Sequence, residues 1–294
     1  MQLSDAAKAG NISLARRLLK KKGVDVNETD SGGATPLMHA SLANDEAMVA
    51  LLIKKGGANV SLGDKDGFTA LIISSQENST TVVKCLIERG GANVDQTKND
   101  GVSPLYISSQ KGHAEVVKLL LGKGADVDQA GNDGGTPLIV SSQNGHQGVV
   151  KLLLAKGANT DQAGTNGATP LFMSTQNGHQ EVVKLLLASG ANVDLANNEG
   201  ATPLFTSSQN GHQEVVKLLL AKGANVDQAM NEGSTPLVVS IQSGHPEVAK
   251  LVLLAKGLDL NQVDNDGTTP LYTSSMNEHP EVAKLLLANG ANVD

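Results

Sequence analysis

A segment of thirteen residues, QNGHQEVVKLLLA, occupies positions 176–188 and recurs unchanged at 209–221, 33 residues further along the chain. Positions 143–155 carry it once more with a single change, Gly148 in place of glutamate. Recurrence at a fixed period of this length is typical of chains that are built from stacked structural repeats. The period therefore constrains the fold more strongly than any other property of these 294 residues.

An anchor of Pro-Leu preceded by serine or threonine marks the same period along most of the chain, with Ala70 replacing proline in one copy. A degenerate unit opens the chain at 3–34, and its polar segment DAAKAGN is what a terminal capping repeat requires. The sequence thus predicts one domain over 1–294 with about nine units. The anchoring leucines, 33 or 34 residues apart, are Leu37, Leu71, Leu105, Leu138, Leu171, Leu204, Leu237 and Leu271.

Each unit holds the residue types that begin and end two short helices. In the unit anchored at Leu171, Thr169 suits a helix N-cap and Pro170 the first helical position. A second helix over 180–188 ends at Gly190, and a turn-rich segment follows. Helices of this length are not stable alone, because even marginal stability in water needs about 12–15 residues. Each unit therefore depends on its neighbours, and the sequence predicts an all-α fold of the solenoid type.

The period, the Thr-Pro-Leu anchor, the paired short helices and the projecting Gly/Asn-rich loop, which we call the finger, together resemble the ankyrin repeat. Residues 201–228, ATPLFTSSQNGHQEVVKLLLAKGANVDQ, are similar to the family consensus almost throughout. The resemblance extends over 3–294 and implies a curved superhelix of stacked helix-turn-helix-β-turn repeats. It also implies a non-enzymatic scaffold that binds another polypeptide on its concave side, formed by finger tips and first helices. Tetratricopeptide repeats have a similar period but lack the Pro-Leu anchor.

The chain departs from the family pattern inside the first helix. The family commonly has histidine directly after Thr-Pro-Leu and Ala-Ala later in the helix. Here the first position carries apolar or aromatic residues, and Ser-Ser mostly replaces Ala-Ala. We expect these changes to alter local hydrogen bonding and the chemistry of the groove while leaving the period intact.

Three sets of residues recur at equivalent positions on the implied concave side. Acidic residues directly before the finger glycine are Asp66, Asp100, Asp133, Glu199, Glu232 and Asp266. Glutamines at the end of the first helix are Gln76, Gln110, Gln143, Gln176, Gln209 and Gln242. Rings in the position after Pro-Leu are Tyr106, Phe172, Phe205 and Tyr272. Together they predict an acidic groove, dotted with rings, that prefers an extended and basic protein partner.

Each set also has a simpler interpretation. Asp-Gly is a common turn sequence, so the aspartates are weak evidence for a binding role. Glu199 and Glu232 are poor turn formers, so they are stronger evidence for a binding role. The glutamines are equally consistent with copies of one ancestral unit. The rings are equally consistent with side chains that fill space under the neighbouring finger.

Six histidines, from His113 to His279, share one position, and this recurrence invites a metal interpretation. Neighbouring packed helices lie about 8–10 Å apart, whereas the ligands of one zinc ion each lie about 2 Å from it. Other units place Asn11, Asp45 and Ser79 at this position, and all three favour helix N-caps. The histidines are therefore expected to be structural. Because no nucleophile with its base, phosphate loop or metal cluster is evident, we expect no enzyme activity, no cofactor and no metal.

The net charge of −7 and the lack of an extended basic stripe argue against a nucleic-acid partner. A local basic cluster, Arg16, Arg17, Lys20, Lys21 and Lys22, suits a solvated helix end, with a localisation signal as the alternative. No apolar run approaches the ~20 residues of a membrane span, and the N-terminus is unlike a signal peptide. With the single Cys85 expected to be a buried, inert thiol, these features predict a cytoplasmic protein without membrane insertion.

Two alternatives to a binding scaffold stay open. The array could set distances as a mechanical spacer within a larger protein, or the similar central units could reflect an engineered, consensus-like scaffold without a natural partner. The final unit keeps an internal-type helix over 280–288, so a face suited to a further unit is left open. We expect this face either to continue into a longer array or to make an end-to-end contact with another chain.

Overall fold

The computed structural model describes residues 2–293 and divides into two compact units. The first unit comprises Met1–Ser141 with Ala155–Ala158, and the second comprises Ser142–Leu154 with Asn159–Asp294. The described residues form eighteen α-helices and one π-helical segment, without a β-strand, and the predicted all-α fold is confirmed. The prediction of a single domain over 1–294 stays a prediction.

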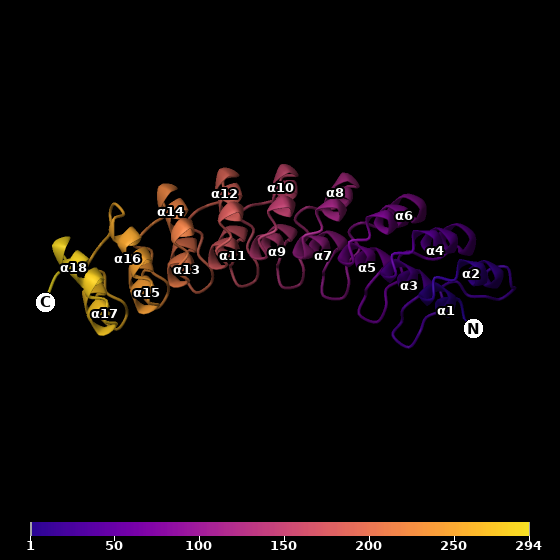
Figure 1. Cartoon of the computed structure of the whole chain (residues 1–294), viewed down its shortest axis with the longest axis horizontal. Helices are drawn as coiled ribbons and strands as arrows, with labels where there is room; N and C mark the ends of the chain where they lie inside the picture. The colour runs from indigo at the N-terminus through magenta and orange to yellow at the C-terminus, as the bar shows by residue number, and fades with distance from the viewer. Residues whose placement is uncertain (1, 294) are drawn as a thin grey trace. The chain divides into compact units, whose positions relative to one another are not determined.

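The helices follow one another in pairs, one pair per sequence repeat (Figure 1). In the N-terminal half they are α1 (Leu3–Lys8), α2 (Ile12–Leu18), α3 (Pro36–Leu42), α4 (Glu46–Leu51), η1 (Leu52–Gly56), α5 (Ala70–Gln76), α6 (Thr80–Gly90), α7 (Pro104–Lys111) and α8 (Ala114–Gly122). They continue as α9 (Pro137–Gln143), α10 (Gln147–Ala155), α11 (Pro170–Gln176), α12 (Gln180–Ala188), α13 (Pro203–Gln209), α14 (Gln213–Ala221), α15 (Pro236–Gln242), α16 (Pro246–Leu253), α17 (Pro270–Met276) and α18 (Pro280–Ala288).

The helix ends lie where the sequence places them. The Thr169 hydroxyl accepts a hydrogen bond from the Phe172 N–H at 3.2 Å, and Pro170 is the first residue of α11. After α12, Gly190 adopts a left-handed conformation with a φ of 90°, which only glycine adopts without strain. The predicted N-cap and C-terminal glycine of this repeat are therefore confirmed.

The segment η1 is a π-helical turn that continues α4. The anchors Leu37 and Leu71 are 34 residues apart, one more than in the central repeats, and the second helix of this repeat widens into a π-turn over Leu52–Gly56. π-Helical structure occurs mostly as such single turns within or beside α-helices. As a result, Lys54 and Lys55 lie on a helical surface rather than in a loop.

Within each unit, like helices pack on like helices of the neighbouring repeat. In the first unit α1, α3, α5 and α7 pack in sequence, as do α2, α4, α6 and α8. In the second unit the same order holds for α11, α13, α15 and α17, and for α12, α14, α16 and α18. Leucine anchors such as Leu105 and Leu204 are fully buried between these layers, which stabilises each by about 2 kcal/mol. Cohesion within a unit therefore comes from the contacts between adjacent repeats.

Candidate functional site

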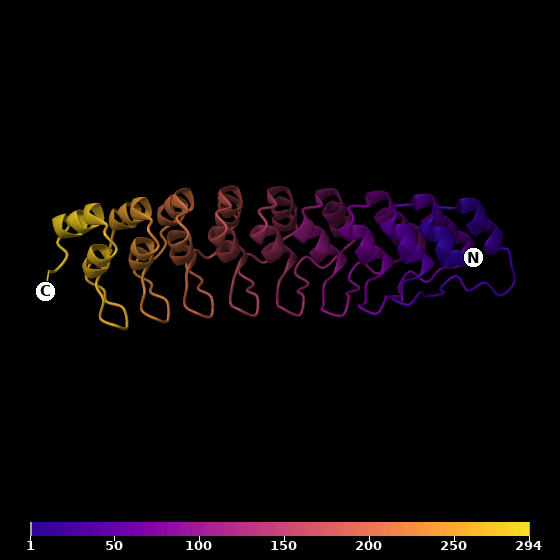
Figure 2. The same cartoon turned by 60° about the horizontal axis from the view of Figure 1, so that its bottom comes forward.

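The finger loops project from the first-helix side of each unit (Figure 2). All six acidic residues before the finger glycines are exposed, three in the first unit and three in the second. The following glycine has a positive φ, which is 82° at Gly101. A Cβ at Gly101 would also lie 2.9 Å from the backbone nitrogen of Asn132 in the next finger. Glycine is required here because the fingers pack against each other along their backbones.

A ladder of asparagines joins the finger tips. In the first unit the Asn132 N–H donates to the carbonyl oxygen of Asp100 at 2.8 Å, and its side-chain amide donates to the Asn99 carbonyl at 3.3 Å. In the second unit the Asn231 N–H donates to the Glu199 carbonyl at 2.9 Å. The backbone carbonyls of these acidic residues thus accept hydrogen bonds from the next finger. The hydrogen bonds hold the backbone that carries their exposed carboxylates.

A second ladder of carboxylates joins the bases of the fingers. The Asp95 carboxylate accepts the Asp126 N–H at 2.9 Å, and the Asp194 carboxylate accepts the Asn225 N–H at 2.9 Å. These residues are held in place by backbone donors of the next repeat. Unlike the acidic residues before the finger glycines, these aspartates stabilise the contact between repeats through their carboxylates.

The predicted glutamines lie at the ends of the first helices, as expected, and most are exposed. Their backbone carbonyls make the inter-repeat contact. His179 Nε2 lies 2.9 Å from the Gln143 carbonyl oxygen, and His212 Nε2 lies 3.0 Å from that of Gln176. Since a carbonyl only accepts, the imidazole Nε2 is the protonated donor.

The histidines occupy the N-cap position of the second helices, but their side chains do not cap. Asn11 and Asp45 do cap, accepting from Leu14 and Met48 N–H groups. The imidazole turns instead toward the preceding repeat, where glycine leaves room for it: a Cβ at Gly178 would lie 2.7 Å from the His212 ring. The histidines therefore connect repeats.

The four predicted rings fall into two groups. Tyr106, Phe172 and Phe205 are only 3–5 % exposed, whereas Tyr272 is 58 % exposed. Phe172 packs in an apolar cluster that includes Ala201 from the next finger. This is the arrangement of the packing interpretation, in which a ring fills space under the neighbouring finger. Of these four rings, only that of Tyr272 is mostly exposed.

One hollow of about 560 Å³ in the first unit, which we call the finger hollow, brings members of all three predicted sets together. Asp100, Tyr106, Gln110 and Asp133 line it, although the sequence names them only as separate columns. Its remaining lining residues are Lys98, Val102, Ile107 and Asn132. Its volume is in the usual range of about 300–1,000 Å³ for ligand sites.

Two nearby carboxylates place negative charge next to Tyr106 in the finger hollow. Burial, together with the charges of Asp133 and Asp100, raises the pKa of Tyr106 to about 12, and the phenol also donates a hydrogen bond to Asp133. Gly135 leaves room for this hydroxyl, since a Cβ there would lie 3.2 Å from it. In the second unit, Ala201 takes the position equivalent to Gly135 and packs against Phe172, a ring that has no hydroxyl.

Lys98 partly neutralises the finger hollow. Its ammonium pairs with the Asp100 carboxylate and lies 5.1 Å from the centre of the Phe68 ring. Partial burial alone would raise the pKa of Asp100, but hydrogen bonds from Lys98 and from the Val102 N–H outweigh it and lower the pKa. The Asp100 carboxyl is therefore ionised at neutral pH and is paired with Lys98 of the same finger.

The acidic residues of the second unit lie in a different setting. Glu199 and Glu232 are exposed on fingers near buried phenylalanines, and Asn166 takes the equivalent position in an earlier finger. Asp266 and Tyr272 line a hollow of about 600 Å³ at the last repeat. Six of the predicted residues thus line two hollows, one in each unit, and the other ten line neither hollow.

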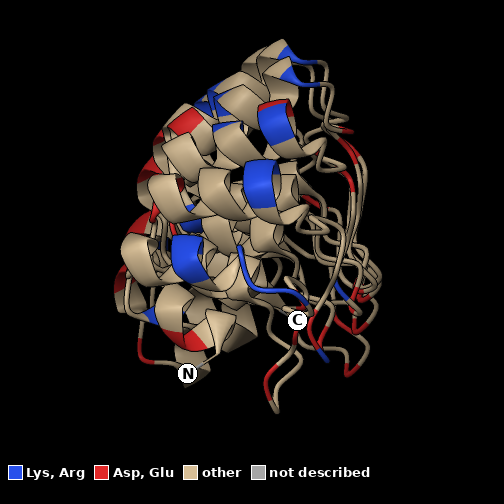
Figure 3. Ribbon diagram, turned by 90° about the vertical axis from the view of Figure 1, so that its right-hand side faces the viewer, with Lys and Arg blue, Asp and Glu red and all other residues tan. Residues whose placement is uncertain are grey.

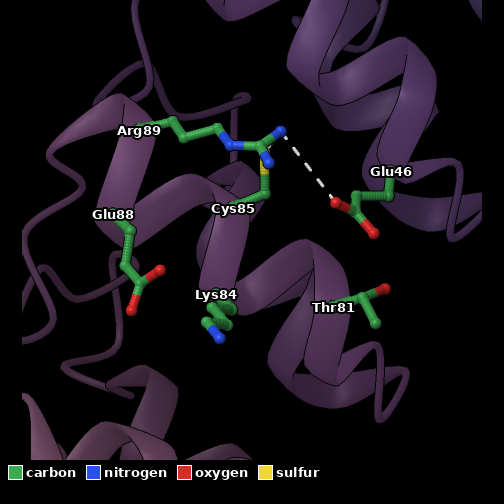
Figure 4. Close-up of a pocket in the computed structure, with 6 residues that line it drawn as sticks. All are labelled: Glu46, Thr81, Lys84, Cys85, Glu88 and Arg89. Atoms are coloured by element: carbon green, nitrogen blue, oxygen red, sulfur yellow. Dashed lines mark hydrogen bonds and ion pairs between the residues drawn. The ribbon is translucent and has the colours of Figure 1, made fainter.

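Among the described residues 2–293, no group of three or more His, Cys, Asp or Glu side chains could hold a metal ion. In the same part of the chain, no helix has the length and apolarity needed to cross a bilayer. Cys85 is buried beside a hollow of about 250 Å³, where the Arg89 guanidinium lies 3.9 Å from its sulfur and 4.0 Å from Glu46 Oε1 (Figure 4). Burial raises the pKa of the Cys85 thiol, as a structural cysteine requires.

The asparagine ladder and Lys98 are features of the candidate site that the sequence interpretation missed. The asparagines recur one residue before the acidic position, at Asn99, Asn132, Asn198, Asn231 and Asn265. The sequence shows this recurrence of asparagine, but it does not show that each asparagine donates to a carbonyl group of another repeat. Lys98 gives no such signal, because no other finger has lysine at its position.

Comparison with known proteins agrees with this architecture. A family model described as ankyrin repeats (3 copies) matches residues 3–98, 77–163, 157–230 and 226–294. The matches extend over almost the whole chain and confirm the resemblance carried by the Pro-Leu anchors. A search of curated proteins finds no match.

Proposed function

Because the chain belongs to the ankyrin repeat family, whose repeats are generally protein-interaction modules, we propose that it is a non-enzymatic scaffold that binds an extended, basic polypeptide. The binding surface is the face formed by finger tips and first helices. The observation that supports this most strongly is the finger hollow, where Asp100, Asp133, Tyr106 and Gln110 meet in about 560 Å³.

The chemistry of the finger hollow suits a cationic side chain. Two carboxylates line it, and burial together with their negative charges raises the pKa of the Tyr106 phenol. An arginine would place its planar guanidinium against these carboxylates and its stem against Val102 and Ile107. Because the fingers repeat, further cations of an extended partner would meet the exposed acids of neighbouring fingers in the same unit.

The test is a titration of a labelled arginine-rich peptide against the intact chain and two matched variants. Asp100→Asn/Asp133→Asn removes the two carboxylate charges and is expected to weaken binding about tenfold, or about 1.4 kcal/mol. Glu115→Gln/Glu278→Gln removes the same charge from exposed sites outside the finger hollow and should leave binding almost unchanged. Equal effects of both variants, or no binding at all, would refute the proposal and favour a spacer or a partnerless scaffold.

The last repeat supports an additional, end-to-end contact. Tyr272, Met276, Leu285 and Leu287 are exposed in α17 and α18. Leu287 is 48 % exposed, whereas its equivalent Leu187 is 8 % exposed because the next repeat covers it. The occupant that these positions fit is therefore another repeat of the same kind. Analytical ultracentrifugation should show concentration-dependent association that Tyr272→Lys/Met276→Gln abolishes; a wild-type chain that stays monomeric at all concentrations would contradict this.

A further inference from the structure

A further hollow, of about 410 Å³, lies between the second helices of the first two repeats. One side is lined by α2 and the residues that follow it, with Arg16, Leu19 and Lys20. The other side is lined by α4 and η1, with Leu51 and Lys55. We call it the basic hollow. Seen from the end of the molecule where α1 and α2 lie, Lys and Arg segments mark the helices, while part of the acidic charge follows the finger loops (Figure 3).

The cations of the basic hollow have no carboxylate partner among the described residues. No ion pair within 4.0 Å involves Arg16, Lys20 or Lys55 in that part of the chain, whereas Lys123 pairs with Glu88 at 2.9 Å on the following helices. Residues 6–24 contain no acidic residue at all. Further exposed cations adjoin the hollow in sequence, namely Arg17, Lys21, Lys22 and Lys54. This concentration of unpaired positive charge occurs in a chain of net charge −7.

The other repeats show that this charge is not required by the fold. The position of Lys20 is occupied by Ala155, Ala188 and Ala221 in the central repeats. The position of Arg16 is occupied by Lys184 and Lys217, and both pair with a glutamate of their own helix, at 2.7 and 2.6 Å. The neighbouring hollow at Cys85 has mixed charges, with Arg89 near Glu46. The basic hollow is therefore specific to the N-terminal repeats.

Leu19 and Leu51 add an apolar surface to the basic hollow, and this surface limits the kind of anionic ligand that fits. Leu51 is buried and Leu19 half-buried, so they form a recessed apolar floor below the cations. A bare polyanion would leave this floor uncovered, and a bilayer requires apolar groups that protrude. A peptide side chain such as leucine reaches the floor while carboxylates on either side of it meet the cations.

We infer that the basic hollow is a docking site for an acidic peptide segment that carries one large apolar side chain. This site lies on second helices and does not depend on the finger hollow. Its chemistry is opposite in sign to that of the finger hollow, so the two surfaces select different segments.

The test uses fluorescence anisotropy with a short labelled peptide of glutamates around a single leucine, and the same peptide with alanine in place of the leucine. The variant Arg16→Ala/Lys20→Ala/Lys55→Ser introduces residues that the array itself has at equivalent positions: Ala50, Ala188 and Ser189. The control Lys151→Ala/Lys156→Ala/Lys222→Ala removes the same charge from exposed positions elsewhere. Far-UV circular dichroism checks that each variant is folded.

We expect the leucine peptide to bind the wild-type chain, and the basic-hollow variant to weaken it about tenfold while the control does not. The alanine peptide should bind several-fold more weakly than the leucine peptide. A second variant, Arg16→Glu/Lys20→Glu/Lys55→Glu, should lose the glutamate peptide and gain a matched lysine–leucine peptide.

Four results would overturn the inference. Equal weakening by the variant and its control would show a general effect of charge. Equal binding of the two peptides would show that the leucine floor is not used. Binding to phosphatidylserine vesicles without peptide binding would assign the surface to a membrane. Self-association that depends on the same three cations would assign it to a second copy of the chain.

Discussion

The imidazole Nε2 of His113 lies 2.8 Å from the carbonyl oxygen of Gln76, although the two residues are 37 positions apart in the sequence. The same contact recurs at 2.9 Å between His179 and Gln143 and at 3.0 Å between His212 and Gln176. These three histidines therefore connect the second helices α8, α12 and α14 to the end of the first helix of the preceding repeat.

His212→Ala tests this connection. The change removes one neutral hydrogen bond and leaves the Gln176 carbonyl without its donor, so we expect a loss of about 1 kcal/mol in the free energy of unfolding. Urea unfolding followed by circular dichroism measures it. Gln213→Ala, at the next and exposed position, should change the free energy much less. Equal effects would show that the histidine contact is not stabilising.

Ser208→Ala should stabilise the chain. The Ser208 hydroxyl is buried and has no hydrogen-bond partner among the described groups, as is true of Ser109 at the equivalent position in the first unit. Ile241 occupies this position in a later repeat, so the site tolerates an apolar side chain. Removal of the unpaired hydroxyl should raise the free energy of unfolding by about 1 kcal/mol. A lower urea midpoint for the variant would contradict this.

Tyr106 should report the electrostatics of the finger hollow. In a Tyr272→Phe chain it is the only tyrosine, and its phenolate absorbance should rise with a midpoint near pH 12. Asp133→Asn should move the midpoint down, since that carboxylate opposes ionisation. A folded-state pKa raised above the ordinary 10 contributes stability that is complete below pH 10 and is lost as the pH rises from 10 to about 12. An unshifted midpoint in folded protein would contradict the placement of Tyr106 beside Asp133.

Lys98→Met should strengthen the binding of arginine-rich peptides. The lysine pairs with Asp100, so its removal frees this carboxylate for the partner. Met230 is the equivalent residue of a later finger, so the substitution suits the loop. We expect an increase in affinity of several-fold, about 1 kcal/mol, in the titration with the labelled arginine-rich peptide. Unchanged or weaker binding would show that Lys98 does not compete for Asp100.

The sequence predicts what is local and periodic. Thr169, Pro170 and Gly190 act within their own repeat, so their residue types were sufficient to place the helix ends. The role of Asn132 depends on carbonyl groups of the preceding finger, and periodicity alone does not say which atoms meet. Tyr106 and Tyr272 share one sequence position, yet the first is buried against the finger that contains Gly135 and the second is exposed, a difference that periodicity does not predict.

The central claim is that no repeat is stable alone and that the finger hollow exists only where repeats stack. Circular dichroism of the isolated peptide 169–201, which contains α11 and α12, tests it most directly. We expect a largely unfolded spectrum without a cooperative thermal transition, since these helices have only seven and nine residues. A helical spectrum that melts cooperatively in the monomeric peptide would contradict it.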